Sequence, residues 1–97
     1  RKVEELLKLL EHPDLKVRQR AQFALADKRA VPDLTKVAHE GKDQLARLHG
    51  IWGLWQVSRK DLKAIKPLVG LLDDKDAEVR AQAAKVLQPG SSQSTSP

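Results

Sequence analysis

The sequence predicts an all-α fold, an α-solenoid built from three stacked helical hairpins. A twelve-residue pattern recurs three times, a second amphipathic helical pattern precedes each copy, and no segment is predicted as a strand. A repeat architecture suits a chain of 97 residues, because so short a chain buries only a modest apolar surface in a single core.

The recurring pattern is Asp-x-x-(Val/Ala)-Arg-x-x-(Ala/Gly)-x-x-(Ala/Gly/Val)-Leu. Each aspartate stands where a helix should begin, so its carboxylate can accept hydrogen bonds from the free amides of the first turn. Each arginine follows four residues later, a spacing that puts the two charges on one helical face. We therefore assign structural roles in the repeat to Asp14, Arg18, Asp43, Arg47, Asp76 and Arg80.

The first hairpin is predicted from helices near 2–11 and 15–28. Apolar residues recur at helical spacing in the first of them, and His12-Pro13 ends it. The second helix carries a single apolar stripe, formed by Val17, Ala21, Ala24 and Leu25.

The second hairpin is predicted from helices near 31–40 and 44–58. Pro32 suits the first turn of a helix, and Gly41 is placed as its C-terminal cap. Two glycines inside the following helical pattern indicate close helix packing, and they are Gly50 and Gly53.

The third hairpin is predicted from helices near 65–73 and 77–88, with Pro67 in a first turn. The repeats then span about 1–29, 30–58 and 59–88. From 89 to 97 the chain is rich in serine and proline and lacks apolar residues, so we expect a flexible tail.

Composition and charge exclude several classes of function. The chain has no cysteine, and no apolar run approaches the roughly 20 residues that a membrane span needs. The net charge of +5 suggests nucleic acid, but the eighteen basic residues are interleaved with thirteen acidic ones, as on a solvated helical surface. Because the sequence opens inside a helical pattern without methionine, we expect a piece of a longer protein.

Catalytic chemistry has little support in the sequence. A metal site needs several His-Glu pairs, and His39-Glu40 is the only one. Neither His12 nor His49 has a partner that suggests catalysis, and there is no thiol nucleophile or Gly-rich phosphate loop. We therefore expect no enzyme activity, no metal site and no cofactor.

The helix pattern Asp-x-x-Val-Arg-x-x-Ala-x-x-Ala-Leu resembles that of HEAT repeats, in particular the phycobilisome-lyase-like subtype, over residues 3–88. The resemblance implies an armadillo-like right-handed superhelix, with first helices on the convex face and second helices on the concave face. It also implies that the Asp and Arg positions link neighbouring repeats. It does not imply a single activity.

Two segments, at 18–26 and 44–55, also resemble the HEAT region of planctomycete-type haem-associated, membrane-bound dehydrogenase-like proteins. In that family the repeats are a spacer between a propeller-like domain and a cytochrome domain, and the Cys-x-x-Cys-His haem motif is absent here. This resemblance implies the cell envelope or periplasm. Without it, the cytoplasm is expected.

Aromatic residues lie outside the apolar stripe of the second helices. Phe23 and Trp52 occupy matching positions in successive copies, with Leu48 one turn before Trp52 and Trp55 one turn after it. Two interpretations stay open: the rings pack between repeats, or they form a concave apolar strip that binds a partner. The candidate partner-binding residues are Phe23, Leu48, Trp52, Trp55 and Lys85.

The sequence thus favours a non-catalytic interaction or scaffold segment that holds a protein partner, or a neighbouring domain of the same chain, on its concave face. One alternative is a spacer of a haem-linked dehydrogenase-like protein. The other is a nucleic-acid-binding surface composed of Lys16, Arg20, Lys42, Arg59, Lys60, Lys63 and Lys66.

Overall fold

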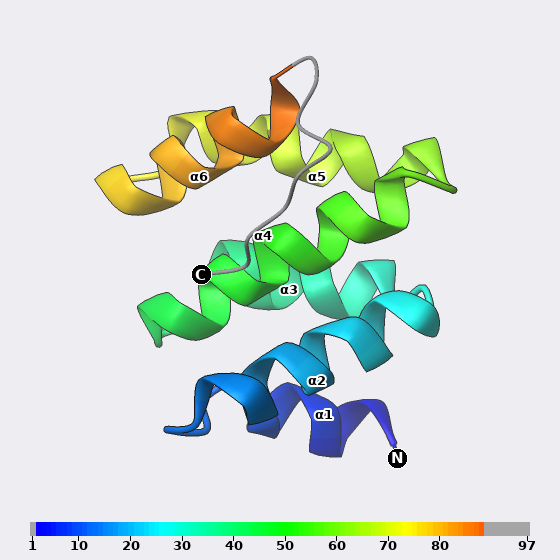
Figure 1. Cartoon of the computed structure of the whole chain (residues 1–97). Helices are drawn as coiled ribbons and strands as arrows, with labels where there is room; N and C mark the ends of the chain where they lie inside the picture. Colours follow the sequence, from blue (N-terminus) through cyan, green and yellow to red (C-terminus); the bar gives the residue numbers. More distant parts are fainter. Residues whose placement is uncertain (1, 89–97) are drawn as a thin grey trace.

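The chain is described by a computed structural model that covers residues 2–88. Within this range the chain forms six α-helices and two short 3₁₀ helices, and no strand (Figure 1). They are α1 (Val3–Leu9), α2 (Leu15–Asp27), α3 (Val31–Glu40), α4 (Gln44–Ser58), η1 (Leu62–Ala64), α5 (Ile65–Gly70), η2 (Leu71–Asp73) and α6 (Ala77–Leu87). The predicted tail, 89–97, lies outside the described residues.

The helices form two layers of a helical-repeat solenoid (Figure 1). The first helices of the hairpins, α1, α3 and α5, form one layer, and α2, α4 and α6 form the other. Helix α1 packs on α2 and α3 packs on α4, while α4 also contacts α2 and α6. The predicted all-α fold is therefore confirmed.

Each second helix begins in the same way. Asp14, Asp43 and Asp76 adopt nearly identical extended conformations, with ψ of 120°, 119° and 120°. Their carboxylates accept hydrogen bonds from the backbone amides two residues ahead, at 2.8, 3.0 and 2.8 Å. The three aspartates are thus N-caps, as the sequence predicts.

The predicted helix 65–73 differs from the observed structure. The segment is α-helical only from Ile65 to Gly70, with a 3₁₀ turn on either side. Pro67 has no amide hydrogen to donate to the carbonyl four residues earlier, so the chain enters through the tighter turn that Asp61 caps. Helix α1 is also shorter than predicted, because the amides from Leu10 to His12 bond three residues back.

Gly41 caps α3 as predicted, but through a different property of glycine. Its backbone is extended, with φ −60° and ψ 145°, rather than left-handed. A Cβ atom at this position would lie 2.6 Å from the carbonyl oxygen of Val37 and 3.2 Å from the Cγ of Arg47. Glycine is needed here for space.

Helix α4 lies at the centre of the fold and is buried on nearly every side. A Cβ atom on Gly50 would lie 3.1 Å from the backbone nitrogen of Ala38 and 3.2 Å from the oxygen of Leu34, so α3 and α4 cross at close range there. This confirms the predicted close packing. None of the helices within residues 2–88 is long and apolar enough to cross a membrane.

Candidate functional site

The arginine of the repeat pattern joins adjacent elements. Arg47 is buried, and its Nε donates to the carbonyl of Ala38 at 2.9 Å. Its Nη2 donates to the carbonyl of His39 at 3.3 Å and to Oδ1 of Asp74 at 2.5 Å. Arg47 therefore closes the end of α3 and connects the second hairpin to the third. The hydrogen bond from Arg47, opposed by burial, lowers the pKa of Asp74.

The other two arginines make related contacts. Nη1 of Arg18 donates to the carbonyls of His12 and Pro13, at 2.7 and 3.0 Å, and that of Arg80 donates to the carbonyl of Asp74 at 2.7 Å. The spacing in the sequence suggested that each arginine pairs with the aspartate four residues before it. Within residues 2–88, none of the three does so. The aspartates instead accept hydrogen bonds from helix amides, while Arg18 and Arg80 donate to carbonyls of the loop before their helix and Arg47 donates to the last turn of α3.

A buried chain of hydrogen bonds joins α2 to α4. Nε of Arg18 donates to Nε2 of His49 at 3.2 Å, and Nδ1 of His49 lies 2.7 Å from Oε1 of Gln22. Nε2 of Gln22 donates in turn to Oε1 of Gln56 at 2.8 Å. His49 must therefore be neutral, with its proton on Nδ1, because its Nε2 accepts from a guanidinium.

Burial, together with the charge of Arg18, lowers the pKa of His49 from 6.5 to about 4, against an opposing contribution from Asp43. The side chain is fully buried. His49 is thus a neutral structural residue between repeats, and no substrate could reach it in this arrangement.

The side chains of the other two histidines, His12 and His39, also form hydrogen bonds. Nδ1 of His12 accepts from the backbone amide of Asp14 at 2.9 Å, in the loop before α2. Nε2 of His39 lies 2.9 Å from the carbonyl of Pro67, so it donates to α5 of the next hairpin. Within the described part of the chain, no three His, Asp or Glu side chains are placed to hold a metal ion.

The predicted aromatic strip is not a continuous exposed surface. The exposed fractions of Leu48, Trp52 and Trp55 are 4%, 1% and 7%, while that of Phe23 is 48%. Nε1 of Trp52 donates to Oε1 of Gln82 in α6 at 3.1 Å, and the two indole rings meet edge to face with centroids 5.6 Å apart. An open strip that includes these three residues is wrong, because the third hairpin supplies both surface and a hydrogen-bond partner to Trp52.

Phe23 remains at the surface, in a hollow shared by α2 and α4. The hollow has a volume of about 210 Å³ and is lined by Phe23, Ala26, Asp27, Arg29, Gln56, Val57 and Lys60. A second hollow, of about 470 Å³, shares Gln56 and Lys60 and adds Trp55 and Arg59. The guanidinium carbon of Arg59 lies 5.3 Å from the centroid of the Trp55 ring. We call Phe23, Arg29, Trp55, Arg59 and Lys60 the aromatic–basic patch.

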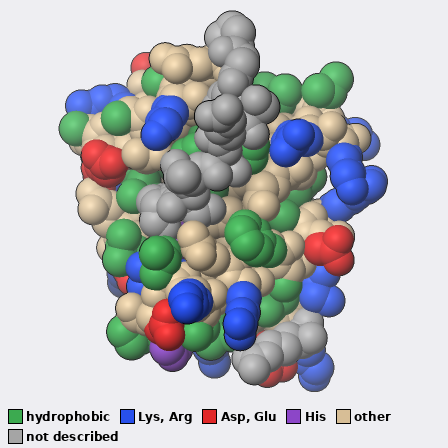
Figure 2. Space-filling model, in the orientation of Figure 1, with side chains coloured by type: hydrophobic (Ala, Val, Ile, Leu, Met, Phe, Trp, Pro, Cys, Tyr) green, Lys and Arg blue, Asp and Glu red, His purple; other side chains and the backbone are tan. Residues whose placement is uncertain are grey.

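Lys85, the other candidate binding residue, is exposed on α6 at the position that matches Phe23 and Trp52. The basic residues considered for nucleic acid are also exposed, but they are spread over several elements from α2 to α5. Lys42 precedes α4 and Lys60 follows it, and a helix of 15 residues is about 22 Å long. Figure 2 shows Lys and Arg side chains at several separate places on one face, interspersed with acidic and hydrophobic ones.

Sequence reasoning missed the polar residues that join the repeats, above all Gln22, Gln56, Gln82 and Asp74. Glutamine on a helix is usually solvated, so its type alone gives no signal. Gln22 and His49 do lie close to the apolar stripe of their helices, which could have indicated burial.

A family model described as HEAT repeats matches residues 3–88. No curated protein matches the chain at a significant level.

Proposed function

The chain belongs to the HEAT repeat family, and on this premise we propose that it is a non-catalytic interaction or scaffold segment that binds a protein partner on its second-helix face. Members of this family commonly mediate protein interactions or act as scaffolds. The aromatic–basic patch is the part of this face that best suits a partner, because it combines an exposed ring with three cations.

The chemistry of the patch defines the partner that it fits. Phe23 offers apolar area beside a hollow, and Arg29, Arg59 and Lys60 surround it with positive charge. A matching segment would place an apolar side chain against Phe23 and carboxylates toward the cations. We therefore propose an acidic segment with a large apolar residue, supplied by another protein or by a neighbouring domain.

The backbone at Arg29 determines where one of these cations lies. Arg29 has a φ of 52°, in the left-handed region that favours glycine. This is the conformation in which α2 ends, one residue after its C-cap. Here it fixes the origin of a cationic side chain at the rim of the hollow that contains Phe23.

The narrower resemblance to haem-associated dehydrogenase-like proteins is one form of this proposal. In that form the partner is a neighbouring domain of the same chain, and the repeats position it.

Affinity capture from an extract of the source organism tests the proposal. The immobilised chain should retain a protein, identified by mass spectrometry, that Phe23→Ser and Arg59→Glu release. Val69→Ser is the matched control, because Val69 is an apolar residue of similar exposure in α5, which belongs to the other layer of helices. The control should retain the same protein.

Two outcomes would contradict the proposal. Equal release by Val69→Ser would mean that the capture reflects general hydrophobicity. Retention that disappears after nuclease treatment, together with submicromolar binding of random DNA or RNA at about 150 mM salt, would favour the nucleic-acid alternative.

A further inference from the structure

The buried chain of hydrogen bonds between α2 and α4 ends at the aromatic–basic patch. It starts at Arg18, whose Nη1 donates to the carbonyl of His12 in the loop before α2. It passes through His49 and Gln22 and ends at Gln56, which lines both hollows of the patch. The orientation of the Gln56 side chain therefore depends on residues that lie outside the patch.

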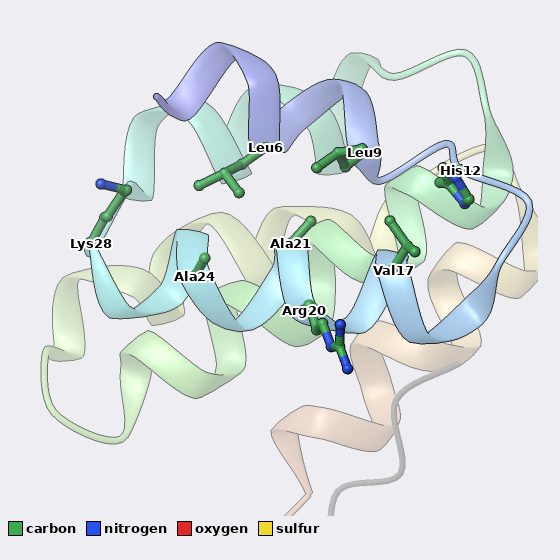
Figure 3. Close-up of a pocket in the computed structure, with 8 residues that line it drawn as sticks. All are labelled: Leu6, Leu9, His12, Val17, Arg20, Ala21, Ala24 and Lys28. Atoms are coloured by element: carbon green, nitrogen blue, oxygen red, sulfur yellow. The ribbon is translucent and has the colours of Figure 1, made fainter. Parts of the chain in front are cut away.

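This polar group distinguishes the patch from the groove between α1 and α2 (Figure 3). The groove has a volume of about 480 Å³, and Leu6, Leu9 and Val17 are directed into it. Two exposed cations, Arg20 and Lys28, lie at its border, and no hydrogen bond within residues 2–88 fixes either side chain. A hydrogen-bonding group held in one orientation is thus a property of the patch and not of the groove.

The chemistry of Arg18 sets the direction of the hydrogen-bond chain. A guanidinium only donates, so Nε2 of His49 must accept and Nδ1 must carry the proton. Nδ1 then donates to Oε1 of Gln22 at 2.7 Å, which leaves Nε2 of Gln22 as the donor to Oε1 of Gln56 at 2.8 Å. Each residue fixes the orientation of the next, so the two ends of the Gln56 amide are not interchangeable.

Gln56 therefore presents a donor to the patch. Its Oε1 already accepts from Gln22, and within residues 2–88 no protein atom accepts from its Nε2, which is accessible to solvent. Arg59 and Lys60 line the larger hollow with it, and Arg59 is held over the ring of Trp55. These three groups can only donate at this place. A carboxylate, that of Asp27, lines the smaller hollow.

We infer that Gln56 determines the specificity of the patch by donating from Nε2 to a carboxylate oxygen of the partner segment. Arg18, His49 and Gln22 are then positioning residues for this donor. This role rests on the function proposed above for the patch. A carboxylate accepts from the amide and from the two cations beside it at once, whereas a reversed amide would turn Oε1 toward the same carboxylate and repel it.

Peptide titration of the full chain, followed by NMR, tests this role. The probe is acetyl-Asp-Glu-Phe-Asp-Glu-amide, and the matched control is acetyl-Asn-Gln-Phe-Asn-Gln-amide. Before addition, the Nε2 protons of Gln56 should exchange with water about tenfold faster than those of Gln22, which are buried. The acidic peptide should shift the backbone amides of Phe23 and Arg59 and move the Nε2 proton signals of Gln56 downfield. The neutral peptide should leave those Nε2 signals in place.

Substitutions by methionine, which is uncharged and similar in length, measure the contribution of the donor. Gln56→Met should weaken binding of the acidic peptide about tenfold, because a hydrogen bond to a charged group is lost. Gln22→Met should weaken it about twofold, because the released amide of Gln56 presents its nitrogen for about half of the time. Gln44→Met, about 18 Å away at the other end of α4, should bind like the unmodified chain.

The outcomes separate this role from the proposed function. Binding that shifts Phe23 and Arg59 but is equally tight in Gln56→Met would overturn the role of Gln56 and leave the patch as the binding surface. Nε2 protons of Gln56 that are protected as well as those of Gln22 would overturn it too, because the amide would then face inward. A peptide that shifts none of the patch amides would contradict the acidic partner itself, and with it the role of Gln56.

Discussion

At the scale of the residue, His49 shows how a buried polar group determines pH sensitivity. It is neutral in the fold because Nε2 accepts from Arg18, and its pKa is lowered to about 4. Between pH 6.5 and about 4 the unfolded chain therefore binds a proton that the folded chain does not. Stability is complete above this window and falls as the pH drops through it.

We predict that the free energy of unfolding in urea falls by roughly 2–3 kcal/mol from about pH 7.5 to about pH 4.5. His49→Gln should remove most of this dependence, because the glutamine side chain does not titrate. Glutamine is chosen because it stands at the matching position of the third copy, as Gln82. A pH dependence that is unchanged in His49→Gln would assign the proton to another group.

Arg29 gives a second prediction at this scale. Its amide donates to the carbonyl of Ala26 at 2.9 Å, and that of Ala30 donates to the carbonyl of Leu25 at 3.1 Å, which is the Schellman arrangement. Glycine adopts the left-handed conformation of position 29 without the steric cost that a side chain incurs. Arg29→Gly should therefore raise the free energy of unfolding by about 1 kcal/mol. Lys28→Gly, at a right-handed position with φ −76°, should lower it by a similar amount.

The same substitution separates stability from binding. If Arg29 belongs to the partner surface, Arg29→Gly should be more stable and yet retain less partner. Thermal melting and the capture experiment measure the two effects on one variant.

At the scale of the element, the sequence predicts what is decided within a few residues. The aspartate caps were predictable because each acts on the helix that it precedes. The division of 62–73 into three short segments was missed because apolar periodicity does not register the missing amide of Pro67. The burial of Trp52 was left open because it depends on Gln82, which lies thirty residues ahead in α6.

Helix α4 provides a paired test of packing. Alanine has the better helix propensity, by about 1 kcal/mol, so both Gly50→Ala and Gly53→Ala gain this contribution. The Cβ atom at position 50 meets backbone atoms of α3, whereas that at position 53 meets the flexible end of Leu34, at 2.9 Å. Gly50→Ala should therefore be less stable than Gly53→Ala by about 1–2 kcal/mol in urea unfolding. Equal midpoints would show that α3 can move away from α4 without cost.

The aromatic residues of the second helices should differ in the same way. Trp52→Ala should cost about 3–5 kcal/mol, because the ring is buried between hairpins, while Phe23→Ala should cost less than about 1 kcal/mol. Tryptophan fluorescence of the unmodified chain should be blue-shifted and resistant to acrylamide. Red-shifted, easily quenched emission would mean that Trp52 and Trp55 are exposed to solvent, as the binding-strip interpretation requires.

At the scale of the whole molecule, the central hairpin joins the outer two. Arg18, Gln22 and His49 connect it to the first hairpin, and Arg47, Trp52 and His39 connect it to the third. Stability in such arrays is approximately a sum of repeat and interface contributions. Weakening one interface should therefore loosen one outer hairpin first.

Arg47→Ala tests this coupling. It removes the donor to Asp74, a part-buried pair, and leaves the carbonyls of Ala38 and His39 without their partner, so it should cost about 2–3 kcal/mol. Because Asp74 belongs to the third hairpin, amide exchange in α6 should accelerate more than exchange in α2, which keeps its own bonds to His49 and Gln56. Lys42→Ala, an exposed cation in the loop just before the same helix, should change neither. Equal acceleration in α2 and α6 would mean that the three hairpins unfold as one cooperative unit, and that Arg47 stabilises the whole array rather than the boundary between the second hairpin and the third.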